Sequence, residues 1–289
     1  MVSIINPTRP KVHRMWFNDN GNEAIDLVVD CHKAQQNVLI VSQTSGGKTS
    51  VMKHIAKNVL KATDWKKQPL LDASGNPVPM TYEQMACLPG TQAESLVGQW
   101  IPQSDGSLAW SDGPMTRAVI NGSFIVFEEF SRLNQDLHGR FFSILDEGFR
   151  TYPLPEKGES LSIHPNCQVV ATANPVQLGY LTHELDIALE DRFVIRDFGN
   201  ENFIDEPKVI EDICGGDKIF AERMINFATE MRVNAATYVT ARQMIQATKL
   251  ISIADMNPVY AIMRCIGEKF SDHKGVIETA AIAHFTETK

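Results

Sequence analysis

The sequence lacks several patterns that mark specialised classes of protein. Its five cysteines are widely spaced and none belongs to a C-x-x-C pair, so we expect neither a disulfide framework nor a structural zinc site. None of the eight histidines has H-E-x-x-H spacing, so no catalytic metal held by protein side chains alone is predicted. Unpaired, reduced thiols are typical of the cytoplasm, which is the compartment we expect.

Long apolar segments are also missing. The longest apolar runs are as short as Phe124–Phe127, so no segment is expected to span a membrane. The N-terminus has no charged-then-apolar leader, so secretion is not expected. The net charge of -8 argues against a protein whose main task is gripping nucleic-acid phosphates, although a local basic groove stays open.

The remaining composition is that of a globular protein. Apolar residues make up 43% of the chain and charged residues 21%, which excludes disordered and fibrous classes. A length of 289 residues suits one large domain and a smaller one.

Short apolar segments alternate with helical patterns in the first two thirds of the chain. The predicted strands are Asn37–Val41, Phe124–Phe127 and Gln168–Thr172, with Tyr82–Cys87 a weaker candidate. Helical spacing is found at residues 22–35, from about Lys48 onward, and at Leu137–Leu145. Buried strands that alternate with helices predict an α/β fold with a parallel sheet between helices.

The pattern changes near residue 200. Residues 1–199 are predicted to form the α/β core and residues 200–289 a small all-helical domain, because the later apolar residues have helical spacing throughout. Segment 68–80 is rich in proline and glycine, which favours a surface loop. Asp105-Gly106 between two alternating segments predicts a hairpin within residues 96–113.

The loop Ser42–Ser50 is similar to the phosphate-binding pattern G-x-x-x-x-G-K-[ST], with Ser42 in place of the first glycine. Gly46 and Gly47 would let backbone N–H groups approach phosphate oxygens, Lys48 would reach the β and γ phosphates, and Thr49 would ligate Mg²⁺. A chance G-K-T in a loop is the alternative, but a strand before it and a helix after it favour a nucleotide site. The predicted nucleotide-binding residues are Gln43, Thr44, Ser45, Gly46, Gly47, Lys48, Thr49 and Ser50.

Three polar residues follow the other two buried strands. Glu128 and Glu129 end one of them, and Asn174 ends the next. Ligands bind at the carboxyl ends of parallel strands, so Glu128 could hold Mg²⁺ and Glu129 could deprotonate the attacking water. Asn174 could hold that water or sense the γ-phosphate. The alternatives are two solvated acids and an ordinary turn residue before proline.

An ordered series of short motifs makes the chain resemble an AAA+ ATPase of the MoxR branch, of the CbbQ/NorQ/GvpN-like group. The matching segments are the phosphate loop at 42–49, Ser95–Gly98, Asp112–Ala118, Phe127–Glu129, Asp146–Gly148, Ala171–Pro175, Asp191–Phe193 and Val239–Arg242. The resemblance implies a P-loop AAA+ core with a C-terminal helical lid and with inserted hairpins near 98–114 and 150–163. In this branch, such hairpins usually face the ring pore or a partner.

The resemblance also implies residue roles. Asn174 matches sensor 1, Arg192 the arginine finger that acts on a neighbouring subunit, and Arg242 sensor 2. Alternatively, Arg192 could pair with Asp191 or Asp197 on the surface, and Arg242 could be an ordinary helix-surface cation. Arg132 could lie at a subunit interface.

We therefore expect a Mg²⁺- and ATP-dependent ATPase that forms a homo-oligomeric ring, most simply a hexamer, and remodels a partner protein. The resemblance implies a partner with a von Willebrand-type domain. Two alternatives stay open: a nucleotide-dependent switch or scaffold with little hydrolysis, and a nucleic-acid or GTP-using motor. Trp100 and Trp110, which flank the first hairpin, could pack in the core or contact a partner.

Overall fold

The protein consists of two compact units. The computed structural model describes residues 16–43, 46–146, 150–175, 185–199, 201–234 and 237–286. One unit runs from Asp19 to Phe203, and the other contains the described residues from Ile204 onward together with residues 16–18.

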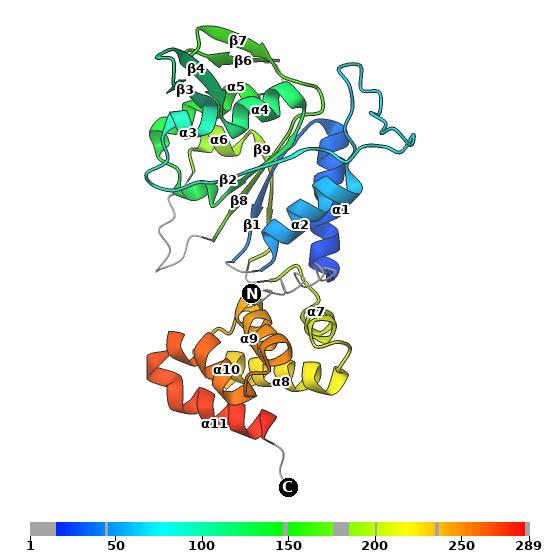
Figure 1. Cartoon of the computed structure of the whole chain (residues 1–289), viewed down its shortest axis with the longest axis vertical. Coiled ribbons are helices and arrows are strands. Elements are labelled where there is room, and N and C mark those ends of the chain that lie inside the picture. Colours follow the sequence, from blue (N-terminus) through cyan, green and yellow to red (C-terminus); the bar gives the residue numbers. More distant parts are fainter. Residues whose placement is uncertain are drawn as a thin grey trace, which may run out of the picture. The chain divides into compact units, whose positions relative to one another are not determined.

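A five-stranded parallel sheet forms the centre of the first unit, with helices on both faces (Figure 1). The strand order is β2-β5-β8-β1-β9. The strands are β1 (Asn37–Val41), β2 (Tyr82–Ala86), β5 (Phe124–Glu128), β8 (Gln168–Ala173) and β9 (Phe193–Asp197). β5 and β8 are buried almost throughout, as expected for central strands covered on both sides. The predicted α/β fold and its three buried strands are confirmed.

The helices of this unit lie before, between and after the strands along the chain. They are α1 (Asp19–Ala34), α2 (Lys48–His54), α3 (Ala93–Val97), α4 (Pro114–Asn121), α5 (Gly139–Leu145) and α6 (Ile187–Glu190). A π-helical turn, η1 (Ile55–Val59), extends α2, and two 3-10 turns, η2 (Phe130–Arg132) and η3 (Gln135–Leu137), precede α5. The core packs side chains of β5, η2 and α5 against one another, with Phe127, Phe130 and Phe141 in edge-to-face or tilted contact.

Two antiparallel hairpins project from this unit. The first pairs β3 (Gly98–Pro102) with β4 (Leu108–Asp112), and the second pairs β6 (Thr151–Leu154) with β7 (Glu159–Ser162). Both lie within the ranges expected from the sequence. Gly98 has a φ of 126° and a Cβ there would stand 2.4 Å from the carbonyl oxygen of Ser111, so only glycine fits this corner.

The two hairpins are joined by a tryptophan. Trp100 is 47% exposed, and its indole N–H donates to the carbonyl oxygen of Glu156 at 3.1 Å. Trp110 packs partly against the core, and its indole N–H donates to Asp112 at 2.7 Å. Of the two alternatives drawn from the sequence, packing against the core therefore holds for Trp110 but not for Trp100.

The second unit is helical in its described residues, as the sequence predicted. Its helices are α7 (Glu206–Ile213), α8 (Lys218–Asn234), α9 (Ala241–Ala254), α10 (Pro258–Cys265) and α11 (Lys274–Phe285), with 3-10 turns η4 (Gly267–Lys269) and η5 (Ser271–His273). They enclose a core that includes Met224, Phe227, Met244 and Ile262. Phe17 pairs with Ile204, which ties the segment before α1 to this unit.

The cysteine side chains are not joined to one another. All five cysteines are free thiols, and burial raises the pKa of Cys87 to about 12. Among the described residues, no helix is both long and apolar enough to cross a membrane.

Candidate functional site

The phosphate loop leaves the sheet at the end of β1 and leads into α2. Ser42 is fully buried, and its N–H donates to the carbonyl oxygen of Ala173 at 3.1 Å. The N–H of Gln43 donates to the carbonyl oxygen of Gly199 at 3.0 Å. The loop is therefore fixed at its start by the strand neighbours of β1 on both sides. The first-glycine position, where the sequence departs from the pattern, is a packed serine.

Gly47 caps α2 in a left-handed conformation, with φ 95° and ψ 8°. An alanine there would cost roughly 1–2 kcal/mol of backbone strain. We expect Gly47→Ala to weaken ATP binding by about tenfold in titration calorimetry, because the N–H groups at the start of α2 would turn away from the phosphates. Gly139→Ala is the matched control, since a Cβ at Gly139 meets open space, and it should bind ATP normally. Normal binding by both variants would show that the loop does not need its left-handed turn.

Lys48 is held inside the loop by four oxygen atoms. Its ammonium donates to the carbonyl oxygen of Ser42, to the Ser42 hydroxyl at 3.3 Å, to the carbonyl oxygen of Gln43 at 2.9 Å and to Asn174 Oδ1 at 3.1 Å. Burial lowers the pKa of Lys48 to about 8, and the nearby charges of Glu129 and Glu128 oppose that shift. Lys48 is thus a desolvated cation for which a phosphate group would be a favourable partner.

Thr49 and Glu128 meet across the loop, since the Thr49 hydroxyl donates to Glu128 Oε1. A hydroxyl and a carboxylate side by side are the hard oxygen donors that Mg²⁺ prefers. Within the described ranges, no group of three or more histidine, cysteine or acidic side chains could hold a metal. Two protein oxygens completed by phosphates and water fit a nucleotide-borne Mg²⁺, which keeps much of its water and few protein ligands. The Glu128 side chain is thus long enough to reach the Thr49 hydroxyl.

Asn174 lies between the loop and the acids. β8, which it follows, is the sheet neighbour of both β1 and β5, and the Asn174 side chain is 4% exposed. The contact with Lys48 places its amide oxygen beside the loop. The carboxyl ends of the three adjacent strands β5, β8 and β1 thus bring Lys48, Thr49, Glu128 and Asn174 into one cluster.

Glu129 has an unusual backbone and a close ionic partner. Its φ of 57° and ψ of 41° are left-handed, a conformation that non-glycine residues seldom adopt outside strained sites. One of its carboxylate oxygens lies 2.7 Å from a guanidinium nitrogen of Arg132, and both side chains are about one third exposed. A subunit interface was one place suggested for Arg132 by the sequence, but this pair was not predicted, because it depends on the 3-10 turn that brings Arg132 back to Glu129.

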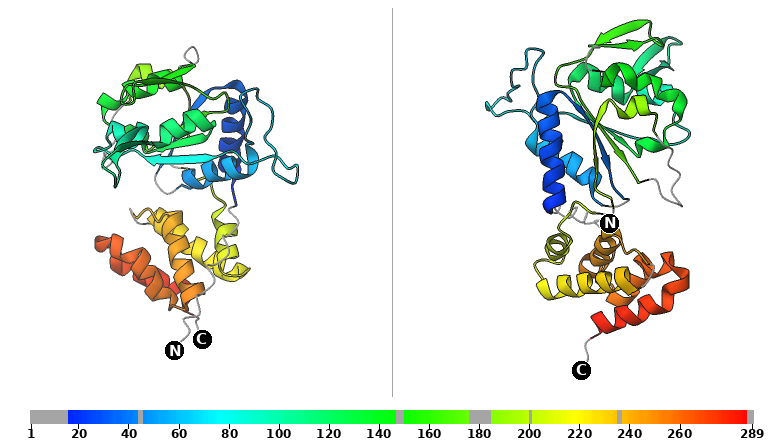
Figure 2. Two further views of the ribbon diagram at one scale, coloured as in Figure 1. Left: turned by 45° about the horizontal axis from the view of Figure 1, so that its top comes forward. Right: turned by 180° about the vertical axis from the view of Figure 1, so that it is seen from behind.

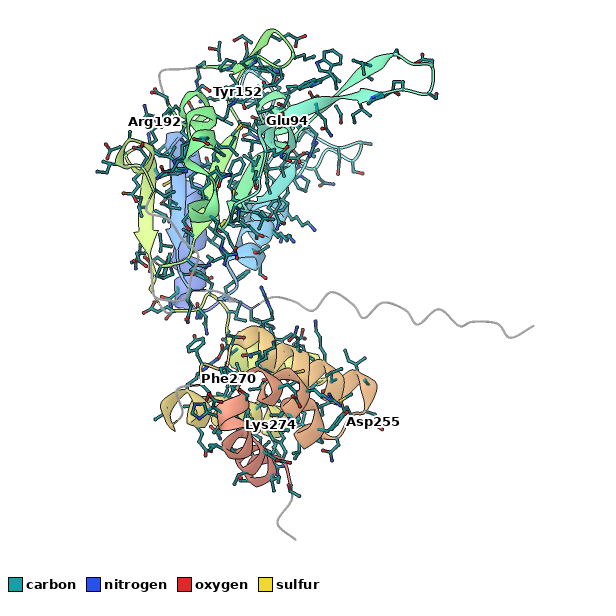
Figure 3. All side chains as sticks on the ribbon, turned by 90° about the vertical axis from the view of Figure 1, so that its left-hand side faces the viewer. Glu94, Tyr152, Arg192, Asp255, Phe270 and Lys274 are labelled. Atoms are coloured by element: carbon teal, nitrogen blue, oxygen red, sulfur yellow. The ribbon has the colours of Figure 1, made fainter. Side chains whose placement is uncertain are left out.

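Arg192 lies at the amino-terminal ends of the strands, whereas the phosphate loop lies at their carboxyl ends. It precedes Phe193, which pairs with Asn37 at the start of β1, whereas the loop follows Val41 at the end of β1. The length of a five-residue strand, roughly 15 Å, separates these two ends. In Figure 3, Arg192 is labelled beside α6, where β9 begins. Arg192 is therefore placed away from the nucleotide site of its own chain.

The guanidinium of Arg192 is held by its own subunit. It donates to the carbonyl oxygen of Ala188, stands 3.5 Å from Asp146 and lies 4.8 Å from the ring centroid of Phe142. The alternative of a surface ion pair with Asp191 or Asp197 does not hold, because the ion pair of Arg192 is with Asp146. An open cavity of about 380 Å³ adjoins Arg192, Asp146 and Gln36.

The remaining predicted residues are only partly placed. Thr44 and Ser45 of the loop lie outside the described residues, as do Glu147 and Gly148 of one motif. Ser50 lies in the first turn of α2 and its N–H donates to the carbonyl oxygen of Gly47 at 2.9 Å. Arg242 is exposed at the start of α9, which is capped by reciprocal bonds between Thr240 and Gln243. Because Arg242 belongs to the helical unit, its role at the phosphates stays a prediction.

Comparison with known families gives a match over most of the first unit. The family model described as AAA domain (dynein-related subfamily) matches residues 37–193. That range begins at β1 and ends at the first residue of β9, so it contains the phosphate loop, the acids, Asn174 and Arg192.

Individual proteins are similar at low identity. Protein CbbQ from Hydrogenophilus thermoluteolus is 29% identical over 150 residues, which cover 51% of this chain and 54% of that protein. Denitrification regulatory protein NirQ from Stutzerimonas stutzeri is 24% identical over 263 residues, or 89% of this chain and 86% of that protein. Gas vesicle ATPase GvpN2 from Halobacterium salinarum is 24% identical over 221 residues, or 75% of this chain and 63% of that protein. The chain thus spans about half the length of CbbQ.

Proposed function

Because the chain belongs to the AAA domain family of the dynein-related subfamily, within the MoxR-like AAA+ ATPases, we propose that it is an ATP hydrolase that works as a ring and remodels a partner protein. The observation that carries this proposal is the cluster of Lys48, Thr49, Glu128 and Asn174 at the ends of three adjacent parallel strands. Each of these residues has the chemistry that phosphoryl transfer requires.

The proposed chemistry assigns one task to each side chain. Lys48 and the N–H groups at the start of α2 would bind the β and γ phosphates. Thr49 and Glu128 would hold Mg²⁺, whose charge would offset that of the phosphates. Glu129 would accept the proton of the attacking water, and Asn174 would orient that water. Glu129 must leave Arg132 to do so, since the carboxylate is bound to that arginine.

The position of Arg192 supports action on a neighbouring subunit. It stands at the start of β9, about one strand length from its own phosphate loop, so it cannot neutralise a γ-phosphate bound there. If a second copy placed its phosphate loop next to the start of β9, Arg192 of the first copy would contact the nucleotide bound to the second copy. A closed ring is the simplest assembly in which every site gains an arginine in this way, and a hexamer is the size we propose.

Mixing two inactive variants tests this arrangement. Arg192→Ala and Glu129→Gln subunits should each be inactive alone, yet a mixture should recover part of the phosphate release. At a mixed interface, one subunit supplies Glu129 with the nucleotide and the other supplies Arg192. Activity should peak at intermediate ratios, and Arg196→Ala, which removes a surface arginine paired with Glu23, is the control that should stay active. No recovery at any ratio would argue against an arginine supplied by the neighbour.

A nucleotide-dependent switch with little hydrolysis is the second candidate. The ion pair between Glu129 and Arg132 favours it, because one oxygen of the proposed base is already bound to an arginine and that contact must break before this oxygen can accept a proton. Steady-state phosphate release with saturating Mg²⁺ and ATP separates the two proposals. Turnover that stays at background in the assembled protein would support the switch.

The partner protein is a proposal drawn from relatives. GvpN2 is named a gas vesicle ATPase and NirQ a denitrification regulatory protein, so the names of these relatives refer to ATP hydrolysis and to the regulation of denitrification. We propose a protein substrate, engaged by the two hairpins, and a von Willebrand-type domain in the partner. A pull-down with Glu129→Gln in ATP should retain that partner.

A further inference from the structure

The segment between η1 and β2 is an ordered arm, although the sequence analysis treated most of it as a surface loop. Residues 61–80 fold back on themselves through three isolated bridges, Lys61 with Pro79, Thr63 with Pro69, and Leu71 with Pro77. Figures 1 and 2 show this cyan segment projecting away from the sheet in every view.

Two aspartates build the turns of this arm. Asp64 Oδ1 accepts from the N–H groups of Lys66 and Gln68 at 2.8 and 2.9 Å. Asp72 Oδ1 accepts in the same way from Ser74 and Asn76 at 2.8 and 2.9 Å. Such side-chain-to-backbone bonds define local shape without a hydrophobic core. The arm therefore has a definite conformation of its own.

The arm displays apolar side chains that its own fold does not bury. Residues 65–77 are exposed without interruption. Within them, Trp65 is 55% exposed, Leu70 44% and Leu71 60%. A single exposed leucine needs no explanation, but three large apolar side chains on one shaped, protruding segment are typical of a contact surface.

The root of the arm is fixed to the core unit. The ring of Trp65 lies 4.5 Å from that of His164, and the Asn166 amide donates to the carbonyl oxygen of Lys61 at 3.4 Å. The N–H of Met80 donates to the carbonyl oxygen of Leu60 at 3.2 Å, which closes the base. A partner would therefore meet a preformed surface, which reduces the entropy lost on binding.

The charge of this region is opposite to that of the rest of the chain. Within residues 61–80, the arm carries Lys61, Lys66 and Lys67 against Asp64 and Asp72, which gives 3 - 2 = +1. The remaining residues carry 24 lysines and arginines and 33 acids, which gives -9. A basic arm on an acidic chain is complementary to the surface that another copy of the same chain offers.

We propose that residues 61–80 are a docking arm that binds an acidic surface of a second copy of this chain. This inference rests on the proposed ring assembly and adds the contact by which the copies recognise each other. The lysines supply attraction and orientation, and the Leu70 and Leu71 side chains are buried on contact.

Charge reversal in the arm is the test. Lys66→Glu with Lys67→Glu should weaken self-association in Mg²⁺ and ATP by ~10-fold or more at about 50 mM salt, measured by sedimentation velocity. The difference from wild type should shrink at about 500 mM salt, because screening removes the attraction. Lys249→Glu with Lys269→Glu makes the same change in net charge on exposed sites of the helical unit and should associate like wild type.

The apolar contribution is tested separately. Leu70→Ser with Leu71→Ser should weaken association by a similar factor with little dependence on salt, whereas Ile253→Ser with Val276→Ser, equally exposed on the helical unit, should not. ATP affinity per chain should be unchanged in all four variants. If the wild-type protein assembles and both arm variants assemble equally well, the docking arm alone is overturned. If the wild-type protein stays monomeric in ATP, the proposed ring is overturned as well. Loss of binding to a labelled single-stranded oligonucleotide in the lysine variant, with assembly intact, would assign the arm to nucleic acid and overturn the proposal.

Discussion

Replacing Lys48 by alanine is expected to abolish nucleotide binding. The Lys48 ammonium is the cation at the centre of the loop, where it already gathers oxygen atoms from Ser42, Gln43 and Asn174. A charge-assisted hydrogen bond contributes about 1.5–3 kcal/mol, so loss of two to the phosphates should weaken binding by ~100-fold or more. Titration calorimetry with Mg²⁺ and ATP measures the effect directly.

The control for that variant is Lys53→Ala, one helical turn or so further along α2. Lys53 is exposed and carries the same charge, so its removal changes the net charge equally and leaves the loop intact. It should bind ATP like wild type. If Lys48→Ala binds ATP with unchanged affinity and stays folded by circular dichroism, the assignment of Ser42–Ser50 as the phosphate loop is wrong.

Apolar runs were enough to predict the interior of the sheet. β1, β5 and β8 are central strands, so each consists mainly of apolar residues. β9 was not predicted, because it is an edge strand in which Phe193 is buried while Ile195 and Arg196 are exposed. Residues 68–77 are exposed, as expected for the surface loop predicted at 68–80, but the turns made by Asp64 and Asp72 were not predicted, since their bonds leave no periodic pattern. The resemblance to the MoxR branch is confirmed by the family match.

The candidate site could be predicted as far as strand ends determine it. Strand order places Asn174 between the phosphate loop and the two glutamates. The residue types suggest that Lys48 binds phosphates and that Thr49 and Glu128 bind Mg²⁺. The ion pairs of Glu129 with Arg132 and of Arg192 with Asp146 were not foreseen. The first depends on a left-handed backbone at a glutamate, which residue type does not signal, and the second joins residues 46 positions apart. The roles of Arg192 and Arg242 and the size of the ring stay predictions.

Replacing Glu129 by glutamine is expected to separate binding from hydrolysis. Glutamine has the same shape but accepts no proton, so ATP should bind with wild-type affinity while turnover falls by about 10²–10⁴-fold, the usual contribution of a general base. Lys48, Thr49 and Glu128 remain in place, so the phosphate and Mg²⁺ contacts are retained. Phosphate release under single-turnover conditions, alongside calorimetric binding, measures the two effects independently.

The ion pair with Arg132 requires its own control, because Glu129→Gln also removes that contact. Arg132→Gln breaks the same pair and keeps the carboxylate. Both side chains are partly exposed, so loss of the pair itself should change stability little. Arg132→Gln should therefore retain turnover, or increase it if release of Glu129 from Arg132 limits the wild-type rate. Hydrolysis retained in Glu129→Gln would mean that another group is the base. Equal loss in both variants would mean that the ion pair, and not proton transfer by Glu129, is what turnover requires.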